Sequence, residues 1–140
     1  MLWIDADVLA SYLSSDSRDS FRLRQKQAAA VMENAQAIFL SDIILFETVY
    51  VLEKLFGYKQ EDVAGALMEF VNAPEVTCQT DKAVVLLALN DHARQPGCSI
   101  ADCLLGRQLQ LSGDTVFATF NTKHFLHYGI DLLDVKSIKP

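Results

Sequence analysis

The sequence predicts an α/β fold in which helices cover both faces of a small, mostly parallel sheet. Short apolar and β-branched runs alternate along the chain with longer segments of helical composition, and this alternation is typical of parallel strands joined by helical crossovers. The chain has 140 residues, a usual length for one domain, and no repeat or Pro/Gly-rich linker divides it. We therefore expect a single domain spanning residues 1–140.

The first half of the chain contains two apolar runs and three helical segments. Ser and Asp residues at 14–17 compete for backbone hydrogen bonds and so separate the first two helices. Ser41 or Asp42 can cap the third helix, and Gly57 can end it. The elements expected here are strands at residues 1–4 and 38–40 and helices at residues 6–13, 18–35 and 42–56.

The second half is divided mainly by its prolines and glycines. Pro74 follows one helical segment, Pro96 and Gly97 follow the next, and Gly113 lies near the end of the last. β-Branched and aromatic residues dominate the runs between these segments. The elements expected here are helices at residues 61–72, 81–93 and 99–111 and strands at residues 76–78, 115–120 and 132–135.

Composition excludes several classes of protein. With 51% hydrophobic and 21% charged residues, the chain has enough apolar surface to fold. Its longest apolar run, residues 83–89, is too short to cross a bilayer, and Asp5 and Asp7 stand where a signal peptide would need basic residues. We therefore expect a cytoplasmic protein. The three cysteines have no C-x-x-C spacing, so we expect reduced thiols. The net charge of −6 argues against a general nucleic-acid coat protein but not against a nuclease.

Asp5 and Asn121 each follow an apolar run that is expected to be a strand. Ligands of open parallel sheets collect at the carboxyl ends of the strands, so both residues are candidates for a binding site. Asp5 can also cap the helix that follows it, as can Asp7. Because one helix start needs only one cap, one of these two acids is left for another role.

Glu47 has apolar neighbours one turn away on either side, namely Ile43, Ile44, Tyr50 and Val51. A carboxylate on such a helix face is costly unless it is paired, hydrogen-bonded or bound to a cation. One interpretation is a buried stem whose head reaches a nearby donor. The other is a metal ligand, which we favour because no basic residue precedes Lys54 in this region.

Asp102 stands three residues after Ser99, the S-x-x-[DE] spacing of a capping box. Capping alone would explain it. A carboxylate at this helix start would also lie beside the sheet edge expected for Asp5. Asp5, Glu47 and Asp102 could then converge on one cleft, where carboxylate oxygens suit Mg²⁺ or Mn²⁺ and such an ion can activate water for phosphodiester hydrolysis.

Four blocks of the sequence together resemble the PIN domain, and more closely the VapC-type toxins of bacterial toxin–antitoxin pairs. They are I-D-A-D-V-L at residues 4–9, S-D-I-I-L-F-E-T-V-Y-V-L at 41–52, S-I-A-D-C-L-L at 99–105 and V-F-A-T-F-N-T-K-H-F at 116–125. The resemblance covers nearly the whole chain, with all four blocks in order.

The resemblance implies a three-layer α/β/α sandwich and a Mg²⁺- or Mn²⁺-dependent endoribonuclease site. The three acids of the family fall on Asp5, Glu47 and Asp102, which would be catalytic residues and metal ligands. Ser99, Thr119 and Asn121 match positions that line the same pocket. The resemblance also implies a homodimer and a cognate antitoxin protein that holds the nuclease inactive.

Asn121 departs from the family pattern, which usually has an aspartate there. An amide offers a carbonyl oxygen but not the charge that helps recruit a second metal ion. Asp114 cannot replace it, because seven residues of extended chain span roughly 23 Å. One tightly bound metal ion is therefore the expectation.

Several basic residues are candidates for contact with a nucleic-acid backbone. Lys123 follows Asn121 closely and is a candidate for phosphate binding. Arg18, Arg22 and Lys26 form a stripe on one predicted helix, with Arg24 nearby. A solvated face is the default explanation of such a stripe, and contact with an RNA backbone or an acidic partner is the alternative. The pair His124 and His127 is more typical of a surface turn than of a metal site.

Two other functions remain open. Asp5-Ala6-Asp7-Val8 also fits the nucleophile motif of haloacid-dehalogenase-type phosphatases, in which Asp5 would attack phosphate and Asp7 would act as the general acid. That interpretation leaves Glu47 unexplained, and Ala118 stands where a further acid is needed. The second alternative is a PIN fold that binds a partner protein and has lost catalysis, which Asn121 would favour.

Overall fold

Helices and strands alternate along the chain, and the predicted α/β fold is confirmed. The computed structural model describes residues 1–15 and 18–140. The strands are β1 (Leu2–Trp3), β2 (Ile38–Leu40), β3 (Val76–Cys78), β4 (Val116–Thr119) and β5 (Asp131–Asp134). The α-helices are α1 (Ala6–Leu13), α2 (Asp19–Asn34), α3 (Asp42–Tyr50), α4 (Gln60–Asn72), α5 (Lys82–Arg94) and α6 (Ile100–Leu111). Short 3-10 helices occupy Thr122–His124, Leu126–Tyr128 and Val135–Ser137.

The bounds agree closely with those expected from the sequence, and α3 shows the clearest difference. One helix was expected to continue to residue 56, but the α-helix ends at Tyr50 and a π-helical segment, Val51–Leu55, follows it. Here the Phe56 N–H donates to the Val51 carbonyl at 3.0 Å, a wider turn than in an α-helix. Gly57, with φ of 73°, ends the segment as expected. Residues 16–17 of the expected Ser/Asp break lie outside the described residues.

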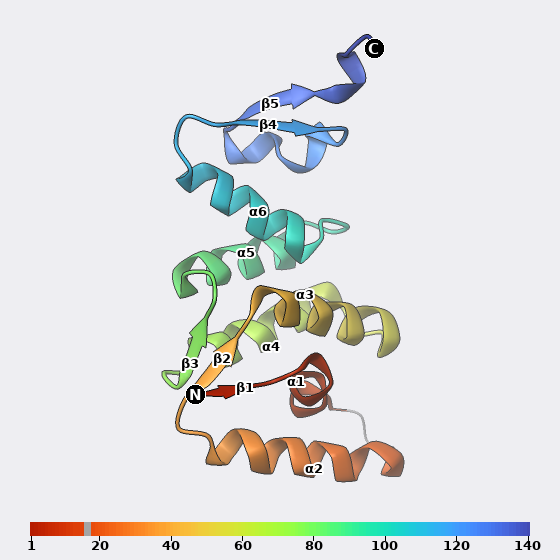
Figure 1. The fold of residues 1–140 in the computed structure, drawn as a ribbon. Coiled ribbons are helices and arrows are strands. Elements are labelled where there is room, and N and C mark those ends of the chain that lie inside the picture. Colours follow the sequence, from red (N-terminus) through yellow and green to blue (C-terminus); the bar gives the residue numbers. More distant parts are fainter. Residues whose placement is uncertain (16–17) are drawn as a thin grey trace.

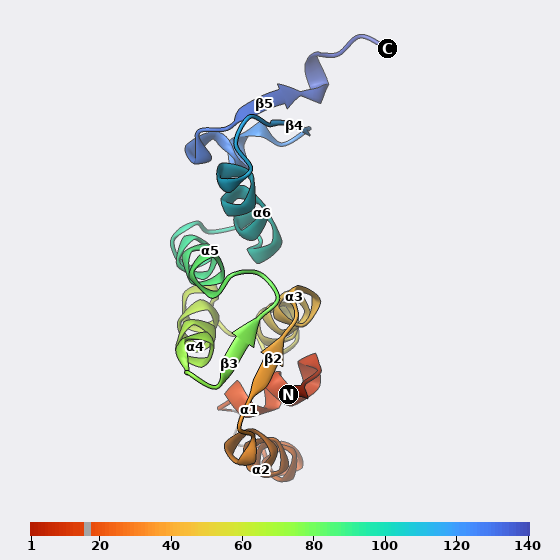
Figure 2. The same cartoon turned by 60° about the vertical axis from the view of Figure 1, so that its left-hand side comes forward.

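The first three strands form a parallel sheet in the order β1-β2-β3. Leu2 pairs with Ile38 and Ile38 pairs with Val76, so β2 lies in the centre. Figure 2 shows α4 on one side of this sheet and α3 on the other, as expected for parallel strands covered on both faces. Ile38 and Leu40 are buried between these layers, and the largest core cluster surrounds them.

The last two strands, β4 and β5, form a parallel sheet of their own. Along β4 the side chains alternate between exposed and half-buried. Phe117 belongs to the inner face and packs edge-on against Phe125, with 4.8 Å between ring centroids. Figure 1 shows this sheet at one end of an elongated molecule, with β1 and α2 toward the other end. The parallel strands are thus divided between two sheets.

A polar network ties the β4–β5 sheet to α5 and α6. Arg107 on α6 donates to both carboxylate oxygens of Asp91 on α5, from Nε at 2.7 Å and from Nη2 at 2.8 Å. The Tyr128 hydroxyl donates to the same carboxylate at 3.1 Å. Tyr128 also lies flat against Gly106, where any Cβ would collide with its ring. Through these contacts α5, α6 and the second sheet pack together as one unit.

Two expectations from composition can be compared with the structure. Across the described residues, every helix is too short or too polar to span a bilayer. Cys78, Cys98 and Cys103 are free thiols, as expected. Burial raises the pKa of the Cys103 thiol, whose Sγ lies 3.5 Å from that of Cys98.

Candidate functional site

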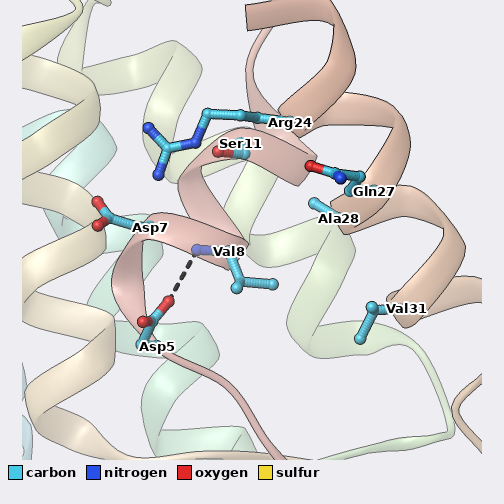
Figure 3. A pocket seen from close by; sticks show the side chains of 8 residues that line it. All are labelled: Asp5, Asp7, Val8, Ser11, Arg24, Gln27, Ala28 and Val31. Carbon is cyan, nitrogen blue, oxygen red and sulfur yellow. Dashed lines mark hydrogen bonds between the residues drawn. The ribbon is translucent and has the colours of Figure 1, made fainter.

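Asp5 caps α1, which is the alternative to a binding role that its sequence context also allowed. Its Oδ1 accepts the Val8 N–H at 2.9 Å, and the side chain is exposed. Asp7 is therefore the acid left without a capping role. Figure 3 shows Asp7 and the guanidinium of Arg24 on one side of α1 and Asp5 at the start of the helix, turned to Val8; all of them line a cavity of about 260 Å³. The sequence placed Arg24 only near a basic stripe, and its position beside these acids depends on how α2 packs on α1.

Glu47 lies on an exposed face of α3. Its neighbours Ile43 and Tyr50 are 66% and 60% exposed, so the apolar surround expected from the sequence exists but does not bury the carboxylate. The expected desolvation cost of Glu47 is therefore absent. Within the described part of the chain the Glu47 carboxylate makes no hydrogen bond or ion pair, whereas the backbone carbonyl of Glu47 accepts the Val51 N–H. The carboxylate is open to a ligand, which is a weaker indication of function than a buried carboxylate would have been.

Asp102 lies half-buried in the first turn of α6, where Ser99 caps the helix by accepting the Asp102 N–H at 3.1 Å. The Asp102 Oδ2 lies 3.3 Å from the Nδ1 of His124. Asn121 lies next to them, with 3.2 Å between its amide nitrogen and the same Nδ1. The Thr119 hydroxyl accepts the Asn121 N–H at 2.9 Å. Four of the candidate residues are thus connected through His124.

His124 is the residue that sequence reasoning missed. A surface turn was expected for it, without any role; the structure instead has His124 half-buried at the end of a short 3-10 helix. One Nδ1 hydrogen cannot be donated to Asp102 while the same nitrogen accepts from the Asn121 amide. An Nδ1–H that is shared between Asp102 and the amide oxygen of Asn121, with that amide turned to present its oxygen, is compatible with both distances. Lys123, next to it in the chain, is exposed.

The loop that leads into α6 is held by a buried histidine. The Nδ1 of His92 lies 2.7 Å from the carbonyl oxygen of Cys98, and its Nε2 lies 2.7 Å from the Glu53 carboxylate. The Gln60 amide also donates to the carbonyls of His92 and Gln95. This anchoring fixes the backbone immediately before Ser99, and therefore the direction in which α6 presents Asp102.

A model of the PIN domain matches residues 2–130. The chain belongs to the PIN domain family. No curated protein and no solved structure matches it. PIN domains are typically metal-dependent nucleases, which makes a nuclease the coarse functional class of this chain. The match gives no support to the haloacid-dehalogenase alternative.

The acids of this PIN domain have the right donor chemistry for Mg²⁺, but one chain does not gather them. Asp5 and Glu47 follow β1 and β2, whereas Asp102 and Asn121 belong to the unit formed by α5, α6 and the second sheet. Among residues 1–15 and 18–140, no three His, Cys, Asp or Glu side chains lie close enough together to hold a metal ion. The expected convergence of the three acids is therefore not met within this arrangement of a single chain.

Proposed function

We propose that this PIN domain is a divalent-metal-dependent endoribonuclease that hydrolyses internal phosphodiester bonds of RNA. The observation that carries the proposal is the position of its carboxylates in a chain of a nuclease family. Asp5 lies at the carboxyl end of β1, Glu47 lies on the helix that follows β2, and Asp102 lies in the first turn of α6. Open parallel sheets bind ligands at the carboxyl ends of their strands, which is where Asp5 lies.

In this proposal Asp5, Glu47 and Asp102 are the catalytic acids and the ligands of Mg²⁺ or Mn²⁺. Ser99, Thr119, Asn121 and Lys123 bind the RNA, with Lys123 as the phosphate contact. Support comes from the contacts around His124, which already connect Asp102 with Asn121 and orient both side chains. Because Asn121 is neutral, the cluster carries a charge suited to one tightly held ion.

The biological role proposed is that of a toxin in a toxin–antitoxin pair, with a homodimer as the working unit and a cognate antitoxin protein as its inhibitor. The support is the resemblance of the four sequence blocks to VapC-type toxins. Induction of the chain alone should arrest growth, and co-expression of the protein encoded by the adjacent small gene should relieve that arrest.

The decisive experiment is cleavage of a defined RNA by the purified chain. We expect cleavage with Mg²⁺ or Mn²⁺, none with a chelator, and loss of activity in Asp5→Asn. Asparagine also caps helices well, so this variant should keep the stability of α1. Asp114→Asn is the matched control, since Asp114 is exposed and lies in the loop before β4. Equal cleavage by all three proteins, or cleavage with chelator present, would refute the proposal.

A protein-binding PIN fold without catalysis is the second candidate. Asn121 and the separation of the acids in one chain favour it. Metal-dependent cleavage by the chain without any partner protein would exclude this candidate.

A further inference from the structure

Each of the two parallel sheets ends in a strand with an unpaired edge. β1 pairs only with β2, and β4 pairs only with β5, across the strands of the described chain. A two-stranded sheet is marginal by itself, and an unpaired edge is a template for another strand. Among the described strands, β3 and β5 also have one unpaired edge each; β1 and β4 are the edge strands that lead into the candidate residues Asp5 and Asn121.

Exposed apolar side chains lie at both of these edges. Trp3 on β1 is 67% exposed and leans on Phe39 of the neighbouring strand. On the second sheet, Val116 and Phe120 are 65% and 66% exposed. Parallel sheets are normally covered on both faces, so these side chains indicate surfaces that are completed by another element.

The candidate site is divided in the same way as the sheets. Asp5 lies two residues beyond the end of β1, and Asn121 lies two residues beyond the end of β4. Parallel pairing of β1 with β4 aligns their carboxyl ends. It would therefore bring Asp5 beside Asn121, and with Asn121 the carboxylate of Asp102.

A β4 strand from the same chain is not positioned for this pairing. Figures 1 and 2 show β1 and β4 in different regions of the elongated molecule, separated by α3, α5 and α6. The contacts of Asp91 with Arg107 and Tyr128 hold the second sheet on α5 and α6, and α5 packs along α4. A second copy can approach β1 without breaking these contacts.

We propose that two copies of this chain exchange their second sheets, so that β4 of each copy pairs with β1 of the other. The exchange is reciprocal, as a two-fold symmetric dimer requires. It pairs the free edge of β1 with the free edge of β4 and leaves β3 and β5 as the outer strands of each joined sheet. Each of its two sites combines Asp5 and Glu47 of one copy with Asp102 and Asn121 of the other. This description of the sites rests on the proposed ribonuclease function, whereas the pairing of the strands does not.

The strand pairing is tested first, without any measurement of activity. In a Cys78→Ser background, one chain carries Trp3→Cys and a differently tagged chain carries Ala118→Cys, and the two are co-expressed and treated with a short bifunctional thiol reagent. We expect a covalent heterodimer, because only two chains can supply this pair of thiols. Gly65→Cys, at an exposed position on α4, replaces Trp3→Cys in the control and should give little product.

Three results of this experiment would overturn the exchange. The first is a monomeric mass by light scattering at micromolar concentration. The second is a dimer that gives no heterodimer cross-link above the control, which indicates association through another face. The third is an internally linked monomer from a single chain carrying both Trp3→Cys and Ala118→Cys, which indicates that β4 closes on its own β1.

The composition of the site is tested by mixing two inactive variants. Asp5→Asn and Asp102→Asn, unfolded together and refolded, should recover about a quarter of wild-type cleavage, because half of the dimers are mixed and each mixed dimer has one intact site. No recovery, alongside an active wild type, would overturn the shared site. A heterodimer cross-link with an inactive wild type would instead leave the exchange standing and refute the ribonuclease function.

Discussion

The two parallel sheets of this protein are built from similarly short strands but are stabilised differently. In the first sheet, β2 has a strand on each side and helices on both faces, and Leu40 is 1% exposed. In the second sheet, alternate residues of both strands are exposed. The second sheet depends on α6 and on the ion pair of Asp91 with Arg107. Two sheets of similarly short parallel strands can therefore differ in burial, because the burial of a sheet depends on whether other elements pack on both of its faces.

The largest effect should come from Leu40→Ala in the covered sheet. Removing a buried leucine leaves a cavity, so we expect the free energy of unfolding to fall by about 2–5 kcal/mol in denaturant titrations. Leu133→Ala in the second sheet is the control, and because Leu133 is 42% exposed the loss should stay below about 1 kcal/mol at low protein concentration. If both variants lost the same free energy of unfolding at low protein concentration, the second sheet would be covered as well as the first, contrary to the comparison above.

Arg107→Ala should destabilise the unit formed by α5, α6 and the second sheet more than it destabilises the first sheet. The substitution leaves the buried Asp91 carboxylate without its bidentate partner, and we expect a loss of about 3 kcal/mol. Amide hydrogen exchange should show protection lost in α6, β4 and β5 before β2. Arg22→Ala is the control, since its pair with Asp19 is exposed and 3.8 Å long, and its effect should be under about 1 kcal/mol. Uniform loss of protection would show that the two regions unfold as one.

Thr48→Val should change the free energy of unfolding least, and it should raise that free energy rather than lower it. The Thr48 hydroxyl is buried in α3 without a hydrogen-bond partner among the described residues. Replacing it with a methyl group of similar size should raise the free energy of unfolding by about 1 kcal/mol. Thr48→Ser, which keeps the hydroxyl and loses a methyl group, should lower it. A destabilised Thr48→Val protein would show that this hydroxyl has a partner after all.

Much of the fold could be predicted because the signals for single elements are local. Asp5, Ser41 and Ser99 each cap the helix that follows, and Gly57 and Gly113 have the positive φ that chain reversals after helices use. Strand pairing is a different matter. Whether β4 lies beside β1 or only beside β5 depends on contacts between residues far apart in the chain, and no local pattern records them.

The candidate site shows the same limit. Asp102 and Asn121 were expected near one another, and His124 connects them, yet no local sequence pattern indicates that His124 approaches Asp102. Glu47 was singled out for its four apolar neighbours, of which Ile43 and Tyr50 are exposed and the other two are half-buried. The hydrophobic pattern of a helix indicates which side chains share a face. It does not indicate whether another element covers that face, which is why the exposure of α3 could not be foreseen.

The contact of Gly106 with the Tyr128 ring has a consequence for the evolution of this chain. Because no side chain fits between α6 and that ring, positions 106 and 128 are not free to change independently. A descendant that gains even alanine at position 106 must either move α6 away from the second sheet or reduce the size of residue 128. The loss of the Tyr128 hydroxyl would then also remove a donor to Asp91. In sequences of related chains, these two positions should therefore vary together, with glycine at one accompanying an aromatic residue at the other.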